Sequence, residues 1–222
     1  EVDRALIPSD VTEAVQNPLS GERAMLHYVG ASADGSFLML SSAGTEIFDN
    51  SESLREPRAV LSLWPTMEGP SEVVDLTQIE NQIVFGRGFL FDEERQEVFV
   101  STIPPSTECV GLELWRIPVQ LESFEVGSPE RIFKTEPCLS GSAGYQQFGG
   151  RIAQGASGEV YLSVGDFANG VSTTREELAD GPYSERPDVL KDPATYGVVM
   201  KIERDGSSEV ISRGHRNPQG LT

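Results

Sequence analysis

The sequence predicts an all-β fold in which a four-stranded antiparallel meander repeats, as in the blades of a β-propeller. Short β-branched and aromatic runs bounded by Gly, Pro, Asp and Ser occur throughout, whereas long amphipathic helical patterns are hard to find. Similar runs recur at nearly even spacing along the chain. With 222 residues, the chain is long enough to bury a sizeable core.

The repeat is clearest in its second strand, which follows a turn such as Asp34-Gly35 or Ser157-Gly158. The three copies of this strand are predicted at residues 35–41, 96–102 and 158–164. The glycine-rich, apolar first strands precede them, at residues 26–30, 86–91 and 149–153. Because glycine permits close approach of backbones, these first strands suit a crowded axis on which blades converge. Trp64 and Trp115 are interpreted as core or blade-packing residues.

Two more strands complete each copy and give the four antiparallel strands of one propeller blade. The third strands are predicted at residues 45–48, 112–118 and 198–202, and the fourth at 71–76, 130–134 and 208–212. The predicted blades are residues 26–80, 81–138 and 145–213, and a further blade starts at about residue 214. Three blades and a fragment leave an exposed sheet edge, so we expect the remaining blades to lie outside residues 1–222. A β-sandwich is the alternative, against which the even spacing argues.

Acidic residues outnumber basic ones by 35 to 17, which gives a formal net charge of −18 at pH 7. Nucleic acid is therefore not expected as a partner, because phosphate binding needs a basic surface. Membrane insertion is not expected either, because no apolar run approaches the ~20 residues of a membrane helix. The acidity is explained by solubility alone or by sites for cations such as Ca²⁺.

Cys109 and Cys138 are the only cysteines. A disulfide that encloses about 30 residues and a pair of buried thiols both remain open for them. No Cys/His spacing typical of a metal site occurs, and two histidines in the whole chain argue against zinc. We expect a periplasmic or secreted protein.

Successive connections of an antiparallel meander alternate between the two ends of a blade. The connections after the second and fourth strands therefore share one face, which collects the predicted loops 103–111, 140–148, 167–196 and 213–217. Function concentrates on such loops over a rigid scaffold. The longest loop offers carboxylates that are either Ca²⁺ ligands or merely solvated, namely Asp180, Glu185, Asp188 and Asp192.

Several runs in the C-terminal part occur in a specific order: FGGRI at 148–152, GEVYLSVGD at 158–166, YGVVMKI at 196–202 and GHRNPQGL at 214–221. This series resembles the glucose/sorbosone dehydrogenase family, which includes the soluble PQQ-dependent quinoprotein sugar dehydrogenases. The resemblance covers about residues 145–222, whereas residues 1–80 match poorly. It implies a six-bladed propeller that oxidises the C1 position of an aldose, passes hydride to PQQ and uses Ca²⁺ to polarise the quinone.

The resemblance also implies roles for four residues. Arg216 and Asn217 match cofactor contacts, where a guanidinium stabilises anionic quinone oxygens. Asp166 matches an aspartate that orients a histidine base. Gln147 stands where that base belongs, and glutamine has no proton that titrates near neutral pH. The other PQQ and Ca²⁺ ligands that the family implies lie beyond residue 222.

Two functions therefore follow from the sequence. One is a PQQ-dependent dehydrogenase acting on a small-molecule sugar or alcohol, and the Arg216-Asn217 pair favours it. The other is a non-catalytic carbohydrate- or protein-binding propeller, which Gln147 favours. Simpler structural explanations also exist: Arg216 can bond loop carbonyls, Asn217 can begin a turn before proline, and Asp166 can form an Asx-turn. His215 is interpreted as structural.

Overall fold

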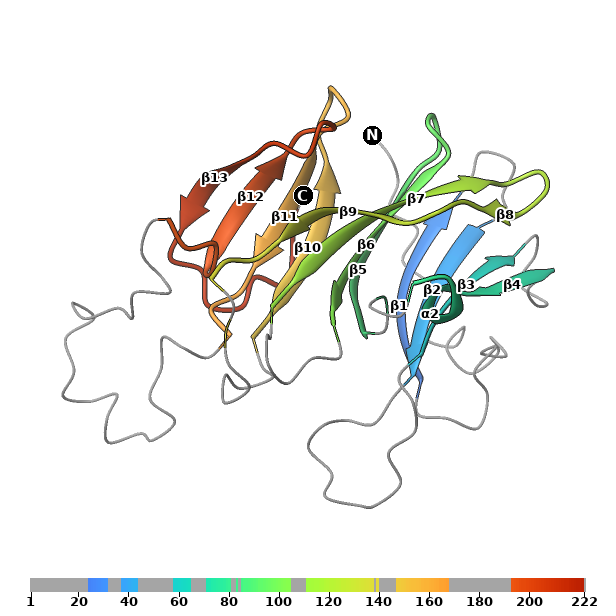
Figure 1. Cartoon of the computed structure of the whole chain (residues 1–222), viewed down its shortest axis with the longest axis horizontal. Helices are drawn as coiled ribbons and strands as arrows, with labels where there is room; N and C mark the ends of the chain where they lie inside the picture. The colour runs from blue at the N-terminus through green and yellow to red at the C-terminus, as the bar shows by residue number, and fades with distance from the viewer. Residues whose placement is uncertain are drawn as a thin grey trace, which may run out of the picture.

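The computed structural model describes residues 24–31, 37–43, 58–64, 71–80, 83, 85–104, 111–137, 139, 147–167 and 193–221. Its described parts form three antiparallel sheets that follow one another along the chain (Figure 1). A single turn of helix, α2 (Leu76–Ile79), is the one helix in these ranges. The predicted all-β class with four-stranded antiparallel sheets is thus confirmed. Closure into a propeller and the number of blades stay predictions.

The first sheet contains four strands paired in chain order. They are β1 (Ala24–Ala31), β2 (Phe37–Ala43), β3 (Arg58–Trp64) and β4 (Glu72–Asp75). The helix α2 follows directly, and the Asp75 carboxylate caps it by accepting a hydrogen bond from the Thr77 N–H at 3.0 Å.

The second sheet contains five strands. They are β5 (Phe85–Asp92), β6 (Glu97–Ile103), β7 (Glu113–Gln120), β8 (Glu125–Val126) and β9 (Glu130–Lys134). The two-residue strand β8, which the sequence pattern did not predict, extends the hairpin that leaves β7. Both β8 and β9 pair with β7, so the four-stranded meander is retained with one short addition.

The third sheet again pairs four strands in chain order. They are β10 (Gly149–Gln154), β11 (Val160–Val164), β12 (Val198–Ile202) and β13 (Ser208–Arg213). Turns with glycine at positive φ precede β11 at Gly158 (φ 89°) and join β12 to β13 at Gly206 (φ 83°).

The prediction was wrong for the third strand of the first sheet. Residues 45–48 lie outside the described ranges, and β3 (Arg58–Trp64) pairs with both β2 and β4 instead. The prediction took the first apolar run after β2. All seven residues of β3 pair with β2, and Ala59 and Leu61 of β3 are buried in the core. A run of four residues is too short to pair along the whole of β2.

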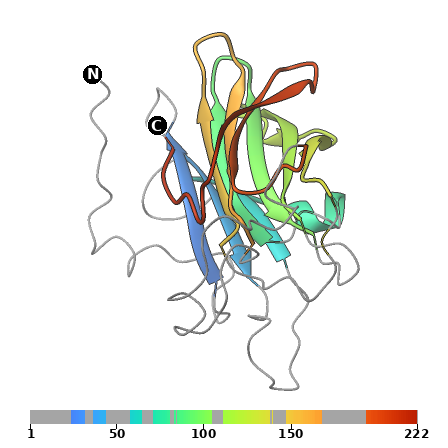
Figure 2. The same ribbon diagram turned by 90° about the vertical axis from the view of Figure 1, so that its left-hand side faces the viewer.

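The first strands of the three sheets lie side by side, β1 against β5 and β5 against β10 (Figures 1 and 2). Glycine makes the second of these contacts possible. A Cβ built on Gly88 of β5 would lie 2.0 Å from the carbonyl oxygen of Gly150 on β10. Ser101 Oγ donates a hydrogen bond to the same Gly150 carbonyl at 2.6 Å. The buried carbonyl oxygen therefore has a hydrogen-bond partner at this close contact.

The apolar core lies in two layers on either side of the middle sheet. Alternate residues of β6 point to opposite faces. Phe99 therefore packs with residues of the third sheet, whereas Val98 and Val100 pack with residues of the first. Trp115 is 5% exposed in the layer against the first sheet, as predicted for a core residue. The side chain of Trp64 lies outside the described part.

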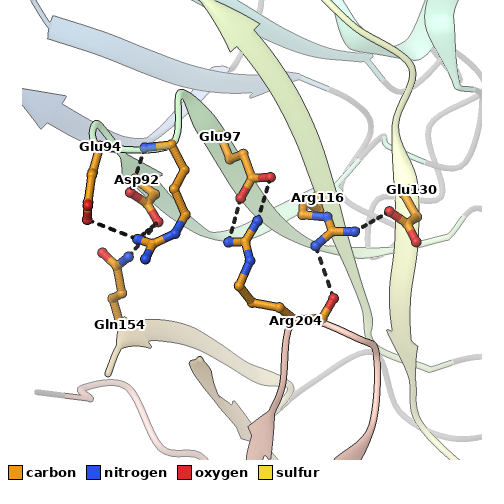
Figure 3. A network of polar contacts seen from close by, with 8 residues as sticks. Asp92, Glu94, Glu97, Arg116, Glu130, Gln154 and Arg204 are labelled. Atoms are coloured by element: carbon orange, nitrogen blue, oxygen red, sulfur yellow. Dashed lines mark hydrogen bonds and ion pairs between the residues drawn. The ribbon is translucent and has the colours of Figure 1, made fainter. Parts of the chain in front are cut away.

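A polar network joins the second and third sheets at the end that carries the β5–β6 and β12–β13 turns (Figure 3). Arg204, in the turn between β12 and β13, forms a two-pronged ion pair with Glu97 of β6 at 2.9 and 3.0 Å. Its carbonyl accepts a hydrogen bond from Arg116 of β7 at 3.1 Å. Gln154 of β10 donates to the buried carboxylate of Asp92 at 2.7 Å. The network ties the two sheets together beyond their apolar contact.

Arg204→Ala should lower the free energy of unfolding by about 1 kcal/mol, because a paired guanidinium at the half-exposed rim between sheets is lost. The loss should shrink in high salt, which screens exposed charges. Urea unfolding at two salt concentrations measures it. Lys201→Ala is the matched control, since Lys201 pairs with Glu203 and Glu209 within one sheet. A cost for Arg204→Ala no larger than that of the control would contradict the role in joining the sheets.

Candidate functional site

Three segments of the third sheet converge at one end of it. The chain entering β10, the chain leaving β11 and the chain leaving β13 are joined by backbone hydrogen bonds. Gly165 N–H donates to the Phe148 carbonyl at 2.8 Å, Phe167 N–H to the Gln147 carbonyl at 3.3 Å, and Asp166 N–H to the Arg216 carbonyl at 2.9 Å. All four residues predicted from the sequence, Gln147, Asp166, Arg216 and Asn217, lie in this cluster.

Gly197 connects the cluster to the start of β12. Its N–H donates to the Gly165 carbonyl at 2.9 Å, and its own carbonyl accepts from the N–H groups of Gly214 and His215 at 2.9 and 3.0 Å. The imidazole Nε2 of His215 lies 2.7 Å from Ser212 Oγ. His215 therefore contributes to the structure of the turn, in agreement with its interpretation from sequence.

Two bulky residues of the cluster have left-handed backbone conformations. Gln147 has φ 61° and Phe167 has φ 54°, a region that non-glycine residues seldom occupy. Phe167 is fully buried and packs edge-on against the rings of Phe148, at 4.8 Å, and Tyr196, at 5.1 Å. A left-handed backbone at a non-glycine residue is strained. Backbone strain of this kind persists where the surrounding packing imposes it, and it is concentrated at functional sites.

Tyr196 anchors this aromatic group to the second sheet. Its hydroxyl donates a hydrogen bond to the Pro137 carbonyl at 2.7 Å, and burial raises the pKa of Tyr196 to about 12. The phenol is therefore neutral at physiological pH and acts as a structural donor.

Gln147 and Arg216 are in direct contact. The Arg216 Nε–H donates to Gln147 Oε1 at 3.0 Å, and the Arg216 side chain is otherwise exposed. Asp166 is only 4% exposed, and its backbone holds the Arg216 main chain. Two of the residues predicted for the site, Gln147 and Arg216, are thus bonded to each other through their side chains.

Asn217 joins the same group through its side-chain oxygen. Oδ1 accepts from the Gly149 N–H at 3.4 Å and from Gln219 Nε2 at 2.5 Å. Gln219 Oε1 in turn accepts from Arg151 Nη2 at 3.2 Å. Ser163 Oγ accepts from the Arg151 N–H at 2.9 Å and donates to the Pro218 carbonyl at 3.2 Å.

Gln219, Arg151 and Ser163 were not predicted as site residues. The signal was present, because Arg151 ends the FGGR run and Gln219 lies in the GHRNPQG run. Arg151 and Gln219 also line an open cavity of about 330 Å³ together with Gly88, Phe89, Ile152, Gly220 and Leu221. Burial lowers the pKa of Arg151 from its ordinary value, which for a guanidinium leaves it charged.

No group of three or more His, Cys, Asp or Glu side chains that could hold a metal ion occurs in the described ranges. The predicted acidic loop residues Asp180, Glu185, Asp188 and Asp192 lie outside those ranges, as do Cys109 and Cys138. Among the helices of the described residues, none is long and apolar enough to span a bilayer.

Comparison with solved structures finds similar folds. Two structures titled "glucose dehydrogenase" and "Crystal structure of glucose dehydrogenase" are each 18% identical to the chain, with TM-scores of 0.52 and 0.56. Each match covers 89% of this chain but only 60% and 56% of the respective structure. This chain therefore spans less than two thirds of the proteins that it resembles.

Comparison with sequences gives the family. No curated protein matches the sequence significantly. Residues 90–222, more than half of the chain, match the sequence model of the family Glucose / Sorbosone dehydrogenase. This range contains the middle and third sheets from Leu90 onward and every residue of the cluster described above. The chain therefore belongs to the glucose/sorbosone dehydrogenase family.

Proposed function

We propose that the chain forms about three blades and the start of a fourth in a six-bladed propeller, and that the complete protein is a PQQ-dependent aldose dehydrogenase with Gln147 in place of the usual base. The observation that carries this proposal is the junction of the FGGRI and GHRNPQG runs. Arg216 contacts Gln147 and Asn217 contacts Gly149 at one end of the third sheet. Family membership supports the same assignment.

The polar groups of this junction fit a cofactor that is rich in hydrogen-bond acceptors. PQQ presents carboxylates and quinone carbonyls. Arg216 uses Nε to bond Gln147, and no described residue accepts a hydrogen bond from its terminal nitrogens. These nitrogens can therefore bind a carboxylate or quinone oxygen as a charge-assisted pair. For Ca²⁺, the described residues offer no ligand set.

PQQ, when bound, supplies a quinone that accepts hydride from the sugar carbon. The residues of this chain contribute charge and orientation. The Arg216 guanidinium stabilises negative charge on ligand oxygens, and Gln147 fixes its direction by accepting from Nε. Gln147 cannot take up the proton of the sugar hydroxyl. Turnover therefore requires a proton acceptor other than Gln147.

A non-catalytic propeller that binds a carbohydrate or a protein is the second candidate. The observation that favours it is the same Gln147–Arg216 hydrogen bond, in which the residue at the base position serves to hold a neighbouring side chain. In either case we propose a periplasmic or secreted location and a small-molecule sugar or alcohol as the first ligand to test.

Titration of the full-length protein with PQQ in the presence of Ca²⁺ should give saturable binding, followed by absorbance or calorimetry. Adding aldoses should then bleach the absorption of the oxidised cofactor. Binding without bleaching would favour the non-catalytic propeller. Absence of binding at any PQQ concentration would exclude the dehydrogenase proposal.

Gln147→His should raise sugar-dependent turnover on the order of 10²-fold, the usual gain from a positioned general base. Histidine is one of the residues that tolerate the left-handed backbone found at this position. Gln147→Asn is the matched control, since asparagine tolerates the same backbone but carries no titratable group. If both variants bind PQQ and neither gains turnover over the parent protein, the missing base does not belong at this position.

A further inference from the structure

The side-chain amides of Asn217 and Gln219 have orientations that follow from their neighbours. A backbone or guanidinium N–H can only donate a hydrogen bond, so the amide atom facing it must be oxygen. The Gly149 N–H therefore requires Oδ1 of Asn217 on its side, and Arg151 Nη2 requires Oε1 of Gln219 on its side. The nitrogen of the Gln219 amide then faces Asn217, to which it donates at 2.5 Å.

This chain of contacts saturates the oxygen of Asn217. Oδ1 accepts two hydrogen bonds, which is its full capacity. Nδ2 is thereby directed away from both donors, and no described residue accepts a hydrogen bond from it. Asn217 is exposed, as is its neighbour in sequence, Arg216, so the N–H groups of Asn217 are accessible to a ligand.

This effect depends on a side chain at position 219 that both accepts and donates a hydrogen bond, as Gln219 does. The residue there has to accept a hydrogen bond from Arg151 and donate one to Asn217 at the same time. A neutral amide does both, whereas a carboxylate only accepts and an apolar side chain does neither. Arg151 is itself held by the partly buried chain of β10 and bonds the Arg87 carbonyl at 3.5 Å.

We propose that Gln219 is a positioning residue of the cofactor site: held by Arg151, it fixes the Asn217 amide with its nitrogen outward, so that Asn217 and Arg216 together present only hydrogen-bond donors. This proposal rests on the function proposed above for its ligand, PQQ, but the amide orientation itself does not depend on that ligand. A ligand surface made only of donors selects for anions and carbonyl oxygens and disfavours ligand hydroxyl or ammonium groups that must donate.

The test is Gln219→Met in the full-length protein, which keeps the side-chain length and the net charge and removes both hydrogen bonds. The first readout is the side-chain ¹⁵N–¹H₂ signal of Asn217, assigned by its loss in Asn217→Asp. We expect a distinct, shifted signal in the parent protein that moves toward the solvent-averaged position in Gln219→Met. Gln120→Met, at an exposed residue of β7, is the matched control and should leave the signal unchanged.

The second readout is the dissociation constant for PQQ with Ca²⁺. Gln219→Met should raise it about tenfold, as expected for one misdirected hydrogen bond to a charged ligand, while the melting temperature stays within about a degree. An unchanged Asn217 signal in Gln219→Met, or an unchanged dissociation constant where the parent binds PQQ, would overturn the proposal. If the parent protein does not bind PQQ, the proposed function fails, and the Asn217 signal still decides the positioning role.

Discussion

Gly165→Ala is expected to destabilise the protein by about 3 kcal/mol or more and to abolish the PQQ binding proposed above. A Cβ at this buried position would lie 1.7 Å from the Gln147 carbonyl oxygen and 2.6 Å from its carbon. Both are backbone atoms, so no side chain can move aside to relieve the clash. Displacing them breaks the bonds that Gln147 and Phe148 accept from the chain leaving β11.

Gly220→Ala is the matched control for this prediction. Gly220 is exposed, and a Cβ built there meets no atom within 4 Å. It also lies near the junction, so any general sensitivity of that region to a methyl group would appear in both variants. Chemical unfolding of the two variants gives the comparison. Equal stabilities would show that the contact between Gly165 and Gln147 is looser than the structure indicates.

Arg131→Ala is expected to cost about 2 kcal/mol of stability at pH 7. The Glu113 carboxylate is 1% exposed and depends on the Arg131 guanidinium at 2.9 Å and on the Trp115 indole N–H at 3.2 Å. Removing one partner of a buried ion pair leaves an uncompensated charge, which costs about 3–5 kcal/mol in full burial. The side chain of Arg131 is 41% exposed, so solvent screening reduces that cost.

The cost of Arg131→Ala should diminish toward acidic pH. Burial already raises the pKa of Glu113 above its ordinary value, against the opposing effect of Arg131 and Lys134. A raised carboxyl pKa makes the native state bind the proton more readily than the unfolded chain. The stabilisation that comes from this raised pKa is fully present below the pKa of glutamate in the unfolded chain, about 4.3. It is lost as the pH rises through the higher pKa of Glu113 in the folded protein.

Unfolding free energies from about pH 3 to pH 8, a range that begins below the ordinary glutamate pKa of about 4.3 and extends above a raised one, check this prediction in the parent, Arg131→Ala and the double variant with Glu113→Gln. Glutamine still accepts from Trp115 but carries no charge, so the double variant should recover most of the loss at pH 7 and show no such pH dependence. If Arg131→Ala still lowers the stability when Glu113 is already glutamine, the lost interaction is the contact of the Arg131 guanidinium with the Trp115 ring, whose centroid is 5.9 Å away.

The strand prediction succeeded where short-range patterns suffice. The strands of the second and third sheets were predicted within a few residues, because alternating apolar residues and glycine turns determine them locally. It failed at β3, because two apolar runs follow β2 and only the pairing of β3 with both β2 and β4 selects between them. Strand β8 is only a hairpin extension and has no apolar pattern of its own.

The sequence by itself determined the all-β class, the antiparallel meanders and the family, and it singled out Gln147, Asp166, Arg216 and Asn217 as candidate site residues, a role that stays a prediction. Only the tertiary structure decided that Gln147 holds Arg216, and that Gln219 connects Asn217 to Arg151. Strand formation follows from neighbours a few residues apart, which sequence patterns record. The hydrogen bonds from Arg216 to Gln147 and from Arg151 to Gln219 join residues more than sixty positions apart, and the orientation of each amide depends on which of its atoms the folded chain brings against an obligate donor.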